Sequence, residues 1–121
     1  PNRLLGGMLW MRLSKSNVQT AIDLSALGLD TIEETETEFR IGAMVSLRQL
    51  ELHEGFTAYS EGANKEALRH IVGVQFRNLA TVGGSIWGRF GCADLAFGDG
   101  QLCGIIQGRY CAGGRFCEYA V

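Results

Sequence analysis

The sequence predicts an α+β fold, and three features of its pattern support this class. Between residues 31 and 46, apolar side chains recur at about every second position, which is typical of strands. Between Asn64 and Ile71, apolar side chains recur three to four residues apart, which is typical of an amphipathic helix. Two Gly-Gly pairs, at residues 6–7 and 83–84, stand between apolar segments and indicate tight turns.

Length and composition limit the possible classes of protein. The chain has 121 residues, of which 46% are hydrophobic and 20% are charged, as expected of one ordinary globular domain. The net charge is only -2 and the 11 Lys and Arg residues are scattered, so we expect no nucleic-acid partner. The longest apolar stretch, residues 4–13, is too short for a membrane helix, which needs roughly 20 residues. With no signal-peptide pattern at the start, we expect a cytoplasmic protein without a membrane span.

The first half of the chain predicts strands and one turn of special interest. A short apolar run at residues 3–5 ends in the first Gly-Gly pair, and residues 8–13 resume with good helix formers. This order of strand, glycine turn and helix start suits a phosphate group. Thr20–Leu24 has the pattern of a short buried strand, and residues 31–46 hold two strand-like runs that predict a hairpin or meander.

Helices are expected after these strands. Ser46 is a suitable N-cap for a short amphipathic helix with apolar residues at positions 47, 50 and 52, and a further helix is expected over Asn64–Ile71. His53 and His70 fall at the end of the first helix and within the second, and we expect both to be structural or surface residues. From Phe76 the helical pattern breaks, and the second Gly-Gly pair implies a close approach of two backbones.

The last part of the chain differs from the rest. Residues 95–121 hold six of the 17 glycines and three of the four cysteines, without clear periodicity. The cysteines form no Cys-x-x-Cys pair and both histidines lie far upstream, so we expect reduced thiols and no metal site. We therefore predict a domain fragment over residues 1–94 and an atypical tail over residues 95–121, which a shifted reading frame in the encoding DNA would explain.

A resemblance to a known family rests on two blocks and one carboxylate. The blocks are residues 39–47, Phe-Arg-Ile-Gly-Ala-Met-Val-Ser-Leu, and residues 74–86, Val-Gln-Phe-Arg-Asn-Leu-Ala-Thr-Val-Gly-Gly-Ser-Ile, and Asp94 follows. Together they resemble the FAD-binding domain, or flavoprotein subunit, of the xanthine dehydrogenase family of molybdenum hydroxylases. The resemblance covers residues 4 to about 95. It implies a two-lobed fold of the type shared with vanillyl-alcohol-oxidase-like flavoproteins, here incomplete at both ends, with FAD between the lobes.

The resemblance also implies which residues bind FAD. Backbone N–H groups of two glycine loops would hold the pyrophosphate, since glycine lets a backbone approach an anion closely. The first loop comprises Leu4, Leu5, Gly6, Gly7, Met8, Leu9 and Trp10, and the second contributes Ala80, Thr81, Gly83, Gly84 and Ser85. Thr81 and Ser85 would add hydroxyl donors. Relatives carry Gly-Gly-x-Thr in the first loop, whereas Leu9 stands at the last position here, so one hydroxyl donor is missing and weaker binding is expected.

Other residues take their expected roles from the same resemblance. Asp94 matches a carboxylate that accepts hydrogen bonds from the ribose hydroxyls of FAD. Phe76 matches a position near the nucleotide portion of FAD, although packing in a core is an equal alternative for it. Arg77 and Asn78 are expected to fix the second loop.

The implied function is electron relay. In the family, electrons pass from a molybdopterin-binding subunit through the [2Fe-2S] clusters of an iron–sulfur subunit to FAD and then to an acceptor, and the flavin itself carries the redox chemistry. No catalytic side chain or metal ligand is therefore expected in this chain. The alternative is a non-catalytic binding or assembly module in which the glycine turns are structural only.

Overall fold

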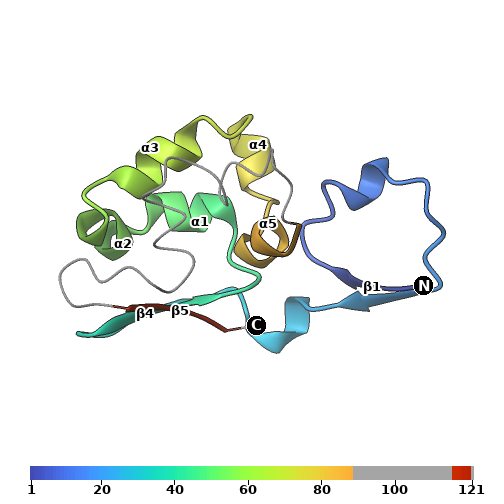
Figure 1. The fold of residues 1–121 in the computed structure, drawn as a ribbon, viewed down its shortest axis with the longest axis horizontal. Coiled ribbons are helices and arrows are strands. Elements are labelled where there is room, and N and C mark those ends of the chain that lie inside the picture. Colours follow the sequence, from blue (N-terminus) through green and yellow to red (C-terminus); the bar gives the residue numbers. More distant parts are fainter. Residues whose placement is uncertain (89–115, 121) are drawn as a thin grey trace.

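The computed structural model describes residues 1–88 and 116–120 and places a layer of helices over a small sheet (Figure 1). In this sheet β4 (Glu38–Gly42) is the central strand. The strand β3 (Ile32–Glu34) pairs with it antiparallel, and β5 (Phe116–Ala120) pairs with its other edge in parallel. This combination of strands and helices confirms the predicted α+β class.

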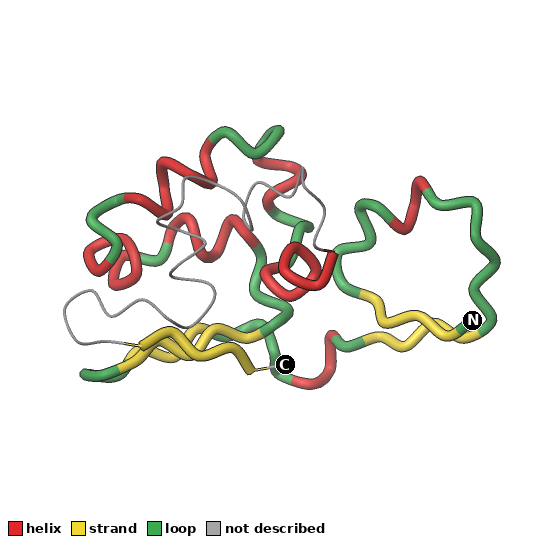
Figure 2. The backbone as a smooth tube through the Cα atoms, viewed as in Figure 1, coloured by secondary structure: helices red, strands yellow, loops and turns green. Residues whose placement is uncertain are grey.

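A second, two-stranded sheet lies to one side of the first (Figure 2). It pairs β1 (Asn2–Leu5) in parallel with β2 (Thr20–Asp23), and the 3-10 helices η1 (Met11–Leu13) and η2 (Ser25–Leu27) follow these strands. The strand at β2 was correctly predicted, but its expected burial is wrong, because all four of its residues are exposed. No residue before Phe39 is buried, so this part of the chain has no core of its own.

The predicted hairpin is confirmed at β3 and β4. Ile32 lies opposite Ile41 in the register, and the turn is closed by Thr35, whose backbone N–H donates to the carbonyl of Glu38 at 2.9 Å. Along β4, Phe39 and Ile41 are buried under the helices while Arg40 points outward. Buried and exposed side chains thus alternate along β4, and its buried side chains form one face of the core.

Five helices form the layer above β4. They are α1 (Leu47–Leu52), α2 (Glu54–Tyr59), α3 (Ala63–Arg69), α4 (Val74–Arg77) and α5 (Val82–Gly88). The helix α1 starts with a capping box: the N–H of Gln49 donates to the Ser46 hydroxyl, and the Gln49 side chain accepts from the N–H of Ser46. Both α1 and α3 were predicted.

The core lies between β4 and this helical layer. Its buried apolar residues are Phe39, Ile41, Val45, Leu47, Leu50, Phe56, Leu68 and Val82. The ring of Phe39 packs edge-on against Phe56, with 5.5 Å between their centroids. The one fully buried amide, Asn64, donates to the Leu50 carbonyl at 3.1 Å and to the Thr57 hydroxyl at 3.1 Å. Its side chain thereby ties α3 to α1 and α2.

The sequence pattern did not predict α2, α4 or α5, and the break expected from Phe76 is wrong because Phe76 lies within α4. The N-cap of α2 is His53, whose Nδ1 accepts the backbone N–H of Phe56 at 3.0 Å. This structural use of His53 agrees with the expectation. The second Gly-Gly pair lies in the first turn of α5, and so the turn predicted there is wrong. Gly83 and Gly84 enter a helix despite their low helix propensity, because the preceding Thr81 caps it through its hydroxyl.

We predict that the cap of α2 contributes measurably to stability. Replacing His53 by Ala removes the acceptor for the N–H of Phe56 and should lower the free energy of unfolding by about 1 kcal/mol. Replacing it by Asn supplies another acceptor and should recover most of this loss. Both variants lose the contact between the rings of His53 and Phe39, so their difference in urea denaturation isolates the cap. Equal stability of the two variants would contradict the assignment.

Candidate functional site

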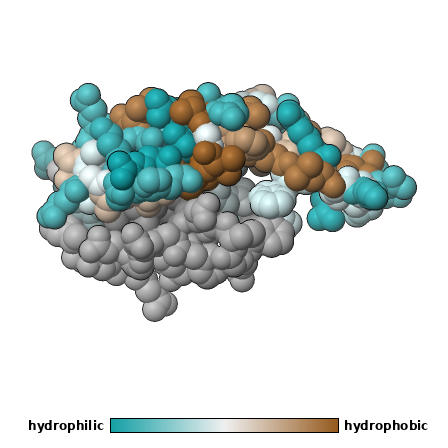
Figure 3. Space-filling model, turned by 90° about the horizontal axis from the view of Figure 1, so that it is seen from above, coloured by the Kyte–Doolittle hydropathy of each residue, from teal (hydrophilic) through white to brown (hydrophobic). Residues whose placement is uncertain are grey.

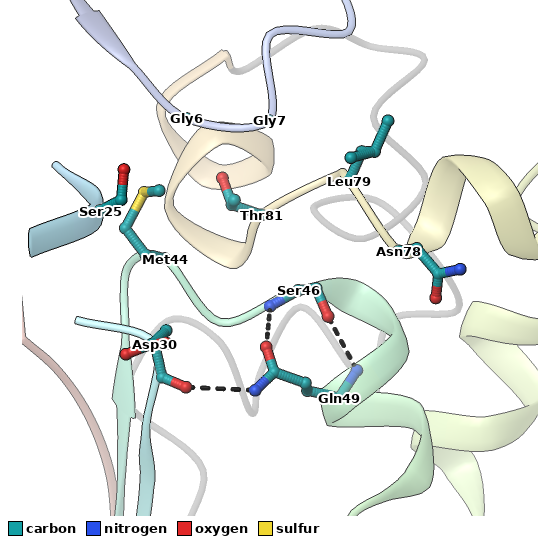
Figure 4. Close-up of a pocket in the computed structure, with 10 residues that line it drawn as sticks. All are labelled: Gly6, Gly7, Ser25, Asp30, Met44, Ser46, Gln49, Asn78, Leu79 and Thr81. Atoms are coloured by element: carbon teal, nitrogen blue, oxygen red, sulfur yellow. Dashed lines mark hydrogen bonds between the residues drawn. The ribbon is translucent and has the colours of Figure 1, made fainter. Parts of the chain in front are cut away.

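The two glycine segments, far apart in the sequence, meet at a pocket (Figure 4). The pocket has a volume of about 280 Å³. Its lining combines the first glycine loop, the connector after β2, the start of α1 and the segment before α5. The lining residues are Gly6, Gly7, Ser25, Asp30, Met44, Ser46, Gln49, Asn78, Leu79 and Thr81.

Glycine is required in the first loop because it runs directly against the segment before α5. A Cβ atom added at Gly7 would lie 1.7 Å from the carbonyl oxygen of Leu79, which no side chain can accommodate. At Gly6 an added Cβ would lie 3.1 Å from the hydroxyl oxygen of Thr81. The missing side chains therefore allow one backbone to lie on the other, as expected for a close approach of two chains.

The first loop presents backbone donors beside the pocket. Within the described residues, the N–H groups of Gly6, Gly7, Met8 and Leu9 have no hydrogen-bond acceptor. Met8 adopts φ of 60°, the left-handed conformation that lets successive N–H groups converge on one side of a turn. A turn with several N–H groups that lack internal acceptors is suited to an anion.

The N–H groups at the start of α5 are used differently. Those of Val82 and Gly83 donate to the carbonyls of Val45 and Ala43, each at 2.9 Å, and that of Gly84 donates to the Thr81 hydroxyl at 3.1 Å. A Cβ at Gly83 would lie 2.8 Å from the Ala43 carbonyl oxygen. Gly83 thus lets α5 pack against the segment between β4 and α1, and its N–H is already satisfied.

Two hydroxyl groups complete the donor set. The oxygen of Thr81 accepts from Gly84, and that of Ser46 accepts from Gln49 at 3.1 Å, so each O–H remains able to donate. The Thr81 side chain points toward the first loop (Figure 4). The hydroxyl of Ser85, by contrast, donates to the Thr81 carbonyl at 2.9 Å. Asp30 is the one charged residue of the lining, so a bound anion would be held by N–H and O–H dipoles.

The predicted binding residues are only partly brought together. Gly6, Gly7 and Thr81 line the pocket, whereas Ala80 does not line it and donates its N–H to the Phe76 carbonyl at 2.8 Å. The other predicted residues of the described part do not line it: Leu4, Leu5, Met8, Leu9, Trp10, Phe76, Gly83, Gly84 and Ser85. Leu4, Trp10 and Phe76 are among the exposed apolar residues. Asp94 lies outside the described residues.

Several lining residues were not predicted as part of a site. Ser46 and Gln49 have the spacing of a capping box, which identifies a helix start but not a pocket. Asn78 was expected to fix the loop and lies in the lining itself. Ser25 and Asp30 belong to the connector between the two sheets, where no periodic pattern reveals a neighbour distant in sequence.

The segment before α5 is held in place from below by a buried ion pair. Arg77 and Glu51 are only 5% and 7% exposed, and Nε of Arg77 lies 3.0 Å from Oε2 of Glu51. Burial acts to raise the pKa of Glu51, but hydrogen bonds from Arg48 and Arg77, together with their positive charges, outweigh it and lower that pKa. Glu51 is thus charged at neutral pH.

Comparison with known proteins places the chain in a family. It matches the family described as FAD binding domain in molybdopterin dehydrogenase over residues 4–100, and it therefore belongs to that family. This confirms the resemblance found in the sequence and makes the chain an FAD-binding domain of the molybdenum-hydroxylase type.

Among solved structures, the fold is similar to that of quinoline 2-oxidoreductase from Pseudomonas putida 86. The TM-score is 0.62 at 20% sequence identity, covering 70% of this chain and 31% of that chain. This chain thus corresponds to less than a third of the matched chain, and the likeness is one of fold. None of the curated proteins matches the chain.

Two further features of the described part bear on the kind of site. No helix within residues 1–88 is both long and apolar enough to cross a membrane. Over the same described residues, no three His, Cys, Asp or Glu side chains are grouped so that they could hold a metal ion.

We predict that Gly7→Ala separates the two backbones at the pocket. The added methyl group collides with the Leu79 carbonyl, so the first loop must move away, and binding of FAD should be lost. Gly28→Ala is a matched control, because an added Cβ there meets no atom within 4 Å. Its φ of 66° makes that variant less stable by about 1 kcal/mol without moving the loop. Retained binding in Gly7→Ala, measured by calorimetry, would contradict the contact.

A pH-dependent effect is expected at Glu51. Glu51→Gln leaves the buried Arg77 without its charged partner and should lower the free energy of unfolding by about 3 kcal/mol at neutral pH. Because the folded-state pKa of Glu51 is lowered, the contribution of its charge is present above the ordinary glutamate range and is lost as pH falls through the folded pKa. The difference between wild type and variant in denaturant melts should therefore shrink on acidification. A constant difference would contradict this.

Proposed function

We propose that the pocket binds the pyrophosphate of FAD. The observation that carries this proposal is the run of N–H groups at Gly6, Gly7, Met8 and Leu9, for which the described residues provide no acceptor. Gly6 and Gly7 line the pocket together with Thr81, and Gly6 lies close to the Thr81 hydroxyl. A diphosphate needs several convergent donors at short range, and backbone N–H groups in a turn supply them without a cationic side chain. The family to which the chain belongs supports FAD as the molecule that carries this diphosphate.

The two glycine segments would then act unequally on the ligand. The first loop would donate hydrogen bonds through its N–H groups. In the second segment Thr81 would donate through its hydroxyl, while Gly83, Gly84 and Ser85, whose donors are used internally, would contribute by leaving room near the phosphates. We further propose that Asp94 accepts hydrogen bonds from the ribose and that Phe76, exposed on α4, lies near the nucleotide.

The proposed role of the domain is electron relay within a larger enzyme. When bound, the isoalloxazine ring supplies the redox chemistry, and this chain holds and orients the dinucleotide. Electrons would pass from a molybdopterin-binding subunit to the [2Fe-2S] clusters of an iron–sulfur subunit and from these clusters to FAD. They would then leave FAD for an external acceptor. We also propose the two-lobed arrangement shared with vanillyl-alcohol-oxidase-like flavoproteins, with residues 1–94 as the FAD-binding fragment and residues 95–121 as a distinct tail.

The alternative of an assembly module with purely structural glycine turns is not favoured. Gly7 and Gly83 do make close backbone contacts of a structural kind. A purely structural turn, however, has no need of four free N–H groups beside a pocket, and the family match supports a flavin site.

Phosphate recognition can be tested with FAD, ADP and riboflavin. We expect FAD and ADP to bind and riboflavin, which lacks phosphate, to bind far more weakly in calorimetric titrations. Thr81→Val should weaken ADP binding by about 1.5 kcal/mol, since it removes one hydrogen bond to a charged group. Thr81→Ser retains the hydroxyl as N-cap and donor and is the control. Equal binding of riboflavin and FAD, or unchanged affinity in Thr81→Val, would contradict the proposal.

A further inference from the structure

Arg77 is held by hydrogen bonds on several sides although it does not line the pocket. Its Nε donates to Glu51 Oε2 at 3.0 Å, and its Nη1 donates to the carbonyls of Arg69 at 3.2 Å and Ile71 at 3.0 Å. One side chain therefore joins α4 to α1 and to the end of α3. Burying such a charge is costly, and an apolar replacement of a buried ion pair is often equally stable. Stability alone does not account for this arrangement.

The helix α4 depends on this side chain for its position. It is a single turn, and Arg77 is its one buried residue. Val74 and Phe76 of the same helix are exposed, so hydrophobic packing does not fix α4 to the core. Polar bonds of Arg77 fix it instead.

The position of α4 is transmitted directly to the pocket. The N–H of Leu79 donates to the Phe76 carbonyl at 3.1 Å, and that of Ala80 donates to the same carbonyl at 2.8 Å. The lining residues Asn78 and Leu79 thus continue the turn of α4 without a flexible joint, and Thr81 follows. A shift of α4 would move the Leu79 carbonyl against which Gly7 lies. The place of Thr81 is set by more than α4, because the neighbouring Ala80 carbonyl accepts the N–H of Leu47 and the Val82 N–H donates to the Val45 carbonyl, each at 2.9 Å.

We propose that Arg77 and Glu51 are positioning residues for ligand binding at this pocket, an inference that rests on the proposed dinucleotide site. They set the place of the Leu79 carbonyl relative to the first loop, and so affect affinity beyond their effect on stability. Arg48 assists, since its Nη1 lies 2.9 Å from Oε2 of Glu51 and orients the carboxylate from the same helix. Lysine could pair with Glu51, but it lacks the planar fork that reaches both carbonyls of α3 and its following turn.

Apolar residues on and around α4 are exposed, which is consistent with polar bonds rather than apolar packing holding this helix in place. Apolar side chains remain visible around the middle of the face shown in Figure 3 and toward its narrow end. Val72, Val74, Phe76 and Leu79 are all exposed, and Val72 has φ of 47°, a strained conformation for a β-branched residue. The neighbouring turn is thus kept in an unfavourable conformation, and the bonds of Arg77 to Ile71 and Arg69 hold it there.

The test compares ADP affinity in folded variants of the 121-residue chain. Arg77→Lys should weaken ADP binding by about tenfold, the lower end of the effect seen when the hydrogen-bond partner that orients a metal ligand is lost. His53→Ala is the matched control, because it destabilises α2 at its cap without contacting α4. Titrations are made at a temperature at which circular dichroism shows each variant fully folded, so that only a positional effect changes affinity.

Each outcome decides the inference. Unchanged ADP affinity in folded Arg77→Lys, or an equal loss in His53→Ala, overturns it and leaves Arg77 as a stabilising residue only. If Arg77→Lys does not fold, Arg48→Gln decides, since Arg48 is partly exposed and its loss only loosens Glu51; weaker ADP binding supports the inference and unchanged binding overturns it. Absence of ADP binding in the wild type would instead overturn the proposed function itself.

Discussion

The rest of the site depends on the contact between the backbone at Gly7 and the carbonyl of Leu79. The β1–β2 sheet makes no extensive contact with any helix that the structure describes, and the first loop is one place where it is attached to the rest. A second is the connector after β2. There the N–H of Met44 donates to the Leu29 carbonyl at 2.8 Å, and the same carbonyl lies so close to Gly42 that a Cβ atom would not fit between them. The pocket lies between these two attachments and exists because both bring backbone against backbone.

Two Gly-Gly pairs that look alike in sequence have different physical roles. In the first, the N–H groups of Gly6 and Gly7 have no acceptor among the described residues, and both glycines line the pocket. In the second, Gly83 fits against Ala43, and its N–H is bonded there. A glycine pair indicates close approach in both cases, but what approaches is decided by residues distant in sequence. In the proposed site, the first pair would thus donate hydrogen bonds to the ligand, while the second lets α5 pack closely against the chain after β4.

Local sequence patterns predicted the parts of the fold that local forces determine. The alternation through Phe39 and Ile41 and the Ser46 cap correctly indicated β4 and α1, because burial and capping act within a few residues. The helix α2 was missed because its cap is an imidazole rather than a common capping residue. The pocket was only partly foreseen, because Asp30 reaches it through the path of the connector, which no periodicity encodes. Recognition of the family, by contrast, rested on two blocks of consecutive residues, 39–47 and 74–86, and on Asp94, and the family match confirms it.

No residue before Phe39 is buried, so the docking of residues 1–38 onto the helical core would depend on the proposed FAD ligand. A segment without a core gains little free energy from docking, and its amide protons exchange through local opening at low cost. A molecule that bridges the first loop and Thr81 binds the docked arrangement alone. By mass action, a concentration of about 100 Kd then favours the docked state by about 2.7 kcal/mol. The cofactor would therefore be a structural component of the domain, and its loss would release the first β-sheet before the helical core unfolds.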